Sequence, residues 1–275
     1  MSAHPVGRLR GFRILAAEAI QDAVRRRVVA AIAAMAVLSL LGVDGCTSCA
    51  SGSIVVNGEA RELPQVAGAT GLVTFTVLSL WCVALAGILA SDHLVETLDD
   101  GSALLSLARP VGRGSFAAAR LSGVLAITFT TGAVLLGATA ALLHRRSELA
   151  LEPALGGALA FAVAAATIAA LTMTLSLFLP RIANVLAVFA LIAAVTVGNV
   201  LSLAGREPEG LLGVLDRFGP PLASSLVLSL SGWIPELELA GDPAAIALRA
   251  LVWAGAAGTA LGLVFGRIEL ARRAP

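Results

Sequence analysis

Charged residues are scarce in this sequence. Only 13% of the 275 residues are Asp, Glu, Lys or Arg, whereas 58% are hydrophobic, and the mean hydropathy is +0.92. A soluble domain carries roughly 25% charged residues, so the composition excludes an ordinary soluble protein and indicates an integral membrane protein. The apolar runs reach about 20 residues without alternating in polarity, which predicts spanning helices and not the shorter, alternating strands of a membrane barrel.

Lysine is absent, and all 19 Lys/Arg positions are arginine. Without lysine the chain has no Walker A motif of the form Gly-x4-Gly-Lys-Ser/Thr, so it is not expected to be an ATPase itself. Its three cysteines are too few for a disulfide scaffold. Cys46 and Cys49 have the spacing of a redox or metal site, but no His or third Cys lies nearby in the sequence. A disulfide or two idle thiols are therefore favoured over a metal site.

Six apolar runs are predicted to cross the membrane as helices. They are residues 28–43, 66–90, 121–143, 154–179, 182–204 and 247–265. The first is only 16 residues long, which is short for a hydrocarbon core of about 30 Å, so we expect it to extend at either end. Between spans five and six, residues 205–246 are rich in proline, and the apolar run 222–234 is too short to span. That run is predicted to be a re-entrant or interfacial segment of an otherwise all-α integral membrane domain covering residues 1–275.

Two segments outside the spans have patterns of their own. Residues 8–24 carry apolar and basic side chains on opposite sides at helical spacing, which predicts an amphipathic helix in the membrane interface; a plain cytoplasmic helical extension is the alternative. No convincing cleavage site follows the first apolar run, so no cleavable signal peptide is expected. In the loop of residues 44–65, the β-forming run Ile54-Val55-Val56 and the turn pair Asn57-Gly58 predict a small hairpin.

The distribution of arginine predicts the orientation. With six spans both termini lie on one side of the membrane, and that side receives 13 of the 19 arginines. The positive-inside rule then places both termini in the cytoplasm, together with residues 92–120 and the tight turn at Pro180-Arg181. Residues 44–65 and 205–246 are expected to face outward.

Ionisable residues are missing from the middle of the membrane. No Asp, Glu, Lys, Arg or His lies well inside spans two to five, where the polar residues are mostly Thr, Ser and Asn. Ion-coupled carriers, intramembrane proteases and membrane metalloenzymes need such residues at that depth, so all three are disfavoured. We therefore expect no catalytic residues and no bound cofactor in this chain, and the energy for any transport must come from a partner.

The polar stretch of residues 92–120, between spans two and three, resembles the corresponding loop of ABC-2 type transporter permeases. The family pattern has an acidic residue, a glycine, a Leu-Leu pair, a Pro-Val/Ile-Ser-Arg turn and a basic residue opening the next span. The matching candidates for ATPase coupling are Asp92, Glu96, Asp99, Asp100, Gly101, Leu104, Leu105, Arg109, Pro110 and Arg113. The chain departs from the pattern at Gly112, where serine is usual, and at Arg120, where lysine is common. Residues 264–270 resemble the C-terminal ending of the NosY-like branch.

The resemblance implies a transmembrane subunit in a bacterial inner membrane that pairs with a second permease copy, as a homodimer or a heterodimer. A separate nucleotide-binding subunit would bind ATP and Mg²⁺, contact residues 96–105 and transmit its closure to the spans. Residues 8–24 resemble the family's elbow helix, and residues 222–234 resemble its outward re-entrant helices. The partners are then the ATPase subunit, the second copy and the lipid bilayer, with no nucleic acid.

Other interpretations remain open. Residues 92–120 could be a solvated loop whose arginines contact anionic lipid headgroups. The chain could be a membrane anchor or assembly scaffold that moves nothing, and an ion-coupled carrier is the third, disfavoured alternative. Asn184 and Asn199 in span five could line a substrate path, although an interhelical hydrogen bond is the favoured role for each. Neither the substrate nor the direction of transport follows from the sequence.

Overall fold

The structure is a computed structural model, and it describes residues 13–14, 16–18, 20–21, 37, 41, 54–56, 59–61, 63–93, 112–234, 237 and 239–267. Within these residues the strands are β1 (Ile54–Val56) and β2 (Glu59–Arg61), and the long helices are α3 (Leu63–His93), α6 (Arg113–Ser147), α7 (Leu151–Ser176), α8 (Arg181–Leu203) and α11 (Pro243–Arg267). The short helices are α9 (Gly210–Phe218), α10 (Leu222–Leu230) and the 3-10 turn η1 (Ser231–Trp233).

Five of the described helices are long and apolar enough to cross a membrane, namely α3, α6, α7, α8 and α11. They coincide with predicted spans two to six, and they are consistent with a multi-pass membrane protein. The predicted first span, residues 28–43, lies outside the described residues except for Val37 and Leu41, which are helical. The predicted interfacial helix of residues 8–24 also lies mostly outside them and stays a prediction.

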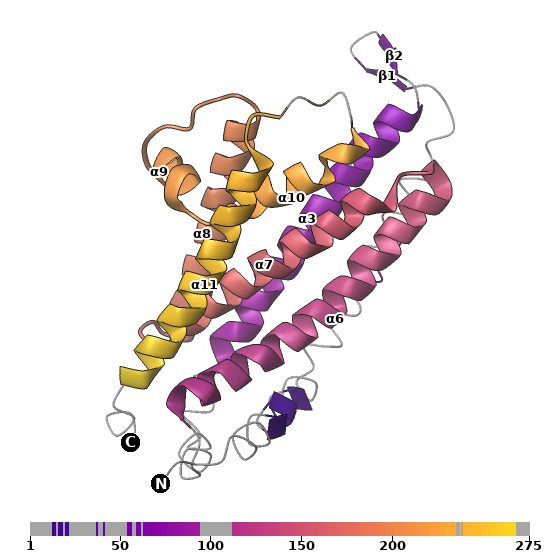
Figure 1. The fold of residues 1–275 in the computed structure, drawn as a ribbon. Helices are drawn as coiled ribbons and strands as arrows, with labels where there is room; N and C mark the ends of the chain where they lie inside the picture. Colours follow the sequence, from indigo (N-terminus) through magenta and orange to yellow (C-terminus); the bar gives the residue numbers. More distant parts are fainter. Residues whose placement is uncertain are drawn as a thin grey trace.

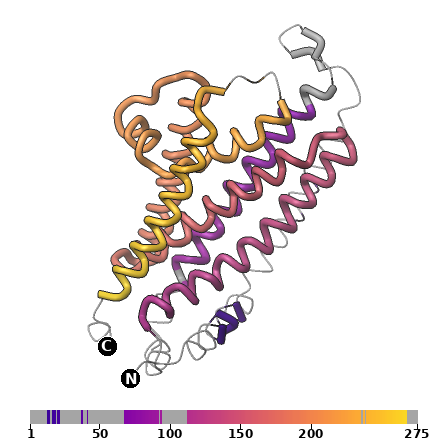
Figure 2. Tube along the Cα trace, in the orientation of Figure 1, coloured from indigo at the N-terminus to yellow at the C-terminus, as the bar shows by residue number. Residues whose placement is uncertain are grey.

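Helix α7 is the centre of the bundle, and it packs against α3, α6, α8, α10 and α11. Consecutive long helices run in opposite directions, so their ends gather at two ends of the bundle (Figure 1). One end holds the C-terminus of α3, the N-terminus of α6, the turn between α7 and α8, and the C-terminus of α11. The other end holds the connection between α6 and α7, and α9 (Figures 1 and 2). The described part of the predicted coupling stretch therefore lies opposite the predicted outward loops.

Short connections join the central helices. Between α6 and α7 the chain turns over Glu148–Ala150, and Glu148 adopts a left-handed conformation (φ 54°) while its N–H donates to the carbonyl of His144 at 3.0 Å. This is the usual way to end a helix, because it satisfies one of the terminal carbonyl groups. The α7–α8 turn ends at Pro180, as the Pro180-Arg181 pair predicts, and the carbonyl of Pro180 accepts from the N–H of Asn184.

Close packing of small residues brings the elements together. Gly157 of α7 lies where an added Cβ would come within 2.8 Å of the Leu230 side chain and 3.0 Å of the Phe75 ring. A Cβ at Gly68 of α3 would collide with the backbone carbonyl oxygen of Trp233. Small residues matter here because helix association in a bilayer depends on packing and hydrogen bonds, since lipid tails are as apolar as the helix surface.

The predicted hairpin is confirmed. Strands β1 and β2 pair antiparallel with Ile54 opposite Arg61, Val55 opposite Ala60 and Val56 opposite Glu59. This register leaves a two-residue connection, which is the length that the Asn57-Gly58 pair favours.

The expectation for residues 205–246 was incomplete. The apolar run 222–234 is a short helix followed by a 3-10 turn, as its length predicts, but a second short helix, α9, precedes it. The axes of the two segments, Gly210–Phe218 and Leu222–Trp233, are bent by 63°. The pair is either one broken span or a re-entrant loop, so the described residues contain five spans, or six if the pair counts as one.

Candidate functional site: a capped break between two short helices

The break between α9 and α10 falls at Gly219-Pro220-Pro221, and all three residues are buried. A buried break is costly because it leaves backbone N–H and C=O groups without helical partners. The two prolines reduce this cost, since neither has an N–H to satisfy. The N–H of Gly219 donates to the carbonyl of Leu215 at 2.7 Å, and the N–H of Leu222 donates to the carbonyl of Pro220 at 2.9 Å.

Asn199 of α8 joins the two short helices. Its side chain is fully buried, and its Nδ2 donates to Oδ1 of Asp216 in α9 at 2.8 Å. Its Oδ1 accepts from the backbone N–H of Ser224 at 3.4 Å and from Oγ of Ser224 at 3.3 Å. Ser224 lies in the first turn of α10, where N–H groups lack helical partners, so Asn199 caps α10 from a neighbouring helix. The interhelical hydrogen bonds expected for Asn199 are therefore present.

Two side chains of α11 donate hydrogen bonds to carbonyl groups at the end of α9, on the other side of the break. Nη1 of Arg249 donates to the carbonyl of Arg217 at 3.3 Å, and Nε1 of Trp253 donates to the carbonyl of Phe218 at 2.9 Å. Arg249 and Trp253 are four residues apart and share one face of α11. Both acceptors belong to the last turn of α9, where carbonyl groups have no helical partner.

Asn184 lies in the first turn of α8, at the opposite end of the same helix. It is fully buried, and its Nδ2 donates to the carbonyl of Thr172 in α7 at 3.2 Å. Its Oδ1 has no hydrogen-bond partner among the described residues. The expected interhelical bond is again present, but the structure does not bring Asn184 and Asn199 together, so a shared role in a substrate path stays a prediction.

Most of the predicted coupling stretch lies outside the described residues. Glu96, Asp99, Asp100, Gly101, Leu104, Leu105, Arg109 and Pro110 are outside them, as are Cys46 and Cys49. The described part consists of the end of α3, where only the backbone of Asp92 is described, and of residues 112–120. Arg113 opens α6, and its Nη1 donates to the carbonyl of Gly266 at 3.5 Å.

The start of α6 is packed firmly against the end of α11. The rings of Phe116 and Phe265 are stacked with centroids 5.9 Å apart, and neither ring is exposed. The guanidinium of Arg120 lies 5.4 Å from the centroid of the Phe116 ring, and its side chain is only 4% exposed. The C-terminal part of the predicted coupling stretch thus packs against the last span, so a force applied to Arg113 would reach two spans at once.

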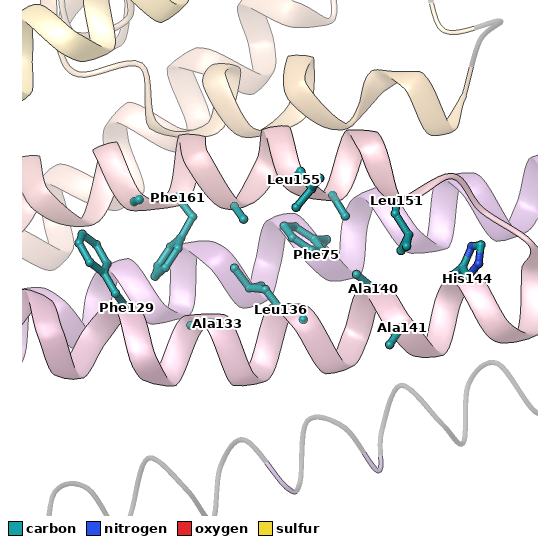
Figure 3. A pocket seen from close by; sticks show the side chains of 15 residues that line it. Phe75, Phe129, Ala133, Leu136, Ala140, Ala141, His144, Leu151, Leu155 and Phe161 are labelled. Atoms are coloured by element: carbon teal, nitrogen blue, oxygen red, sulfur yellow. The ribbon is translucent and has the colours of Figure 1, made fainter.

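An apolar groove between α6 and α7 is the second feature with a possible role (Figure 3). Its volume is about 720 Å³. Phe129 and Phe161 lie at one end, His144 and Leu151 at the other, and Phe75 of α3 lies behind the middle. His144 is the one ionisable residue among the side chains that line it.

The described residues of the two features do not form a metal site. Among the described residues, no group of three or more His, Cys, Asp or Glu side chains gathers in a way that could hold a metal ion. No protein-family model matches the chain, and no match to a functionally characterised protein was found. The function must therefore be argued from the chain's own residues.

The side chains that gather around the break with Asn199 were not predicted from the sequence. Asp216, Arg249 and Trp253 are far from Asn199 in sequence, and only the crossing of four helices brings them together. One signal was available: Asp216 and Arg249 are ionisable residues within or beside otherwise apolar runs, and such residues are usually paired inside a membrane protein.

Proposed function

We propose that this chain is the transmembrane subunit of an ATP-driven transporter of the ABC-2 permease type, working with a second permease copy and a separate ATPase subunit. The capped break between α9 and α10 is the observation that supports transport best. Membrane proteins tolerate broken helices where the break is buried in protein or lines a cavity, and broken helices recur at the substrate sites of transporters. A passive anchor has no need of such a device.

The positions of the helix ends support a role of residues 92–120 in coupling the spans to an ATPase. The C-terminus of α3 and the N-terminus of α6, which are the described parts of the predicted coupling stretch, lie at the end of the bundle opposite α9 (Figure 1). Arg113 contacts the backbone of α11 and is followed by the stack of Phe116 on Phe265. In this proposal, an ATPase that pulls on residues 96–105 moves α3, α6 and α11 together, and α11 carries the movement to α9 through Arg249 and Trp253.

Charge reversal at the predicted docking surface tests the proposal. The full-length chain would be purified from its native host, and the retention of a soluble ATPase would be measured for Glu96→Arg and Arg113→Glu. Like charges across an interface cost several kcal/mol, so we expect ATPase retention to fall by about tenfold or more. Arg206→Glu is the matched control, since it makes the same change at an exposed arginine that follows the C-terminal end of α8. Full retention of an ATPase by both docking variants would refute docking at this stretch.

A second measurement separates transport from scaffolding. If the chain drives transport, ATP hydrolysis by the reconstituted complex depends on the coupling stretch, and it falls in Arg113→Glu while Arg206→Glu keeps the wild-type rate. A scaffold would anchor the ATPase without changing its rate of hydrolysis. Equal hydrolysis by the free ATPase, the wild-type complex and both variants would therefore favour the scaffold.

A further inference from the structure

The groove between α6 and α7 extends over one half of the membrane. It begins near Phe129, close to the middle of α6, and ends at His144, three residues before the helix ends at Ser147. At a rise of about 1.5 Å per residue, the groove is roughly 22 Å long. Half of the hydrocarbon core is about 15 Å thick, so the groove covers one leaflet and reaches the level of the headgroups.

The walls of the groove are apolar, and many of their residues are small. These include Gly132, Ala133 and Gly137 of α6 and Ala158 and Ala162 of α7. No described atom lies within 4 Å of a Cβ placed at Gly137. Its volume of about 720 Å³ is within the range of roughly 300 to 1,000 Å³ that is usual for ligand pockets. A concave apolar channel of this length suits a flexible hydrocarbon chain better than it suits a helix.

His144 lines one end of the groove, its mouth, and charged residues follow it in the sequence. Nδ1 of His144 lies 2.8 Å from the carbonyl of Leu149 and must donate to it, because a carbonyl can only accept. The ring is thereby held across the connection between α6 and α7, and its Nε2 is left for another group. Arg145 and Arg146 follow His144 and are exposed, as are the acidic residues Glu148 and Glu152. Arginine pairs with phosphate through two parallel hydrogen bonds.

We propose that this groove is a phospholipid site, in which one acyl chain lies between α6 and α7 and the phosphodiester lies beside His144 and Arg145. The site is independent of the proposed transport function. The phosphodiester is common to anionic and zwitterionic phospholipids, and the two carboxylates at the mouth provide a place for an ammonium headgroup. Lipid bound in this way would be retained in preference to the bulk lipid around the other helices.

Photolabelling tests the site directly. The full-length chain would be reconstituted with trace phospholipid that carries a diazirine in its acyl chain, and the labelled peptides would be identified by mass spectrometry. We expect label to concentrate on residues 129–141 and 155–162. Gly137→Leu fills the groove and should reduce this label by about tenfold, the effect of removing between one and two buried CH2 groups from the site.

Gly255→Leu is the matched control. Gly255 is also helical, lies in α11, and likewise has no described atom within 4 Å of an added Cβ, so the same side chain enters the membrane outside the groove. We expect its labelling pattern to equal that of the wild type. Label spread evenly over all lipid-facing helices, or equal loss in both variants, would overturn the proposal.

The headgroup is tested separately. Arg145→Gln combined with Arg146→Gln should lower groove labelling by phosphatidylglycerol and phosphatidylethanolamine probes, and should leave labelling by a diacylglycerol probe unchanged. Equal labelling by all three probes in the wild type would show that no phosphodiester is recognised. Residues 28–43 of this chain are the alternative occupant of the groove. In that case the groove stays unlabelled by lipid, and a double variant with Val37→Cys and Gly137→Cys forms a disulfide crosslink. Either result would overturn the proposal.

Discussion

Replacing Asn199 with alanine should lower the free energy of unfolding, because Asn199 joins α8 to α9 and α10. The change removes the bond of Nδ2 to Asp216 at 2.8 Å and the cap on the N–H of Ser224. Hydrogen bonds to charged groups contribute about 1.5 to 3 kcal/mol in soluble proteins, whereas interhelical bonds measured in membrane proteins average about 0.6 and reach about 1.7 kcal/mol. For the Asn199–Asp216 pair, which is partly buried, we expect about 1 to 2 kcal/mol.

A double-mutant cycle isolates this bond. The free energy of unfolding would be measured in detergent micelles for Asn199→Ala, Asp216→Ala and the double variant, with circular dichroism as the signal. Asn199→Ala alone should cost more than the coupling energy, because it also leaves the N–H of Ser224 without its cap. The expected coupling energy for the pair is about 1 to 2 kcal/mol.

Asn184 provides the control cycle. It lies on the same helix as Asn199, about 22 Å away at about 1.5 Å per residue, and its bond goes to Thr172. Asn184→Ala combined with Asp216→Ala should therefore be additive within about 0.3 to 0.5 kcal/mol. If the Asn199 cycle is equally additive, the hydrogen bond does not hold the break together and the reasoning above is wrong.

Two further variants test the packing of α3 against η1 and of α11 against α9. Gly68→Ala places a Cβ against the carbonyl oxygen of Trp233, so it should lower the free energy of unfolding by about 1 to 3 kcal/mol. Gly255→Ala is the control, because its Cβ meets no described atom within 4 Å, and it should be neutral or slightly stabilising. Equal unfolding midpoints for the two variants would contradict the close approach of α3 and η1. Trp253→Phe keeps most of the ring but loses the hydrogen bond of Nε1 to the carbonyl of Phe218 at 2.9 Å. It should lower the free energy of unfolding by about 0.5 to 1.5 kcal/mol and increase amide hydrogen exchange in α9. Unchanged exchange in α9 would contradict the role of Trp253 in capping this helix.

The spans were predictable because they depend on length and polarity alone. A helix needs about 20 apolar residues to cross the hydrocarbon core, and the runs of this chain from residue 66 onward meet that requirement clearly. The hairpin was equally local, since a β-forming run followed by Asn57-Gly58 specifies it within a few residues.

Helix α9 was missed for a local reason as well. It has only nine residues, and it lies between Pro208 on one side and Gly219-Pro220-Pro221 on the other. Such residues signal loops, and an isolated helix of this length is marginal in water. Its stability therefore depends on contacts with α8 and α11, which the sequence does not display.

The sequence by itself determined the class of protein, the place of the five described spans and the short length of residues 222–234, because these depend on hydrophobicity along one continuous segment. Only the tertiary structure decided which groups form hydrogen bonds with the polar atoms at the break between α9 and α10. Asn199 meets Asp216 across 17 residues and Ser224 across 25, and Arg249 meets Arg217 across 32. Such pairings follow from how helices cross, and backbone groups freed inside an apolar bundle must find partners wherever the crossing places them.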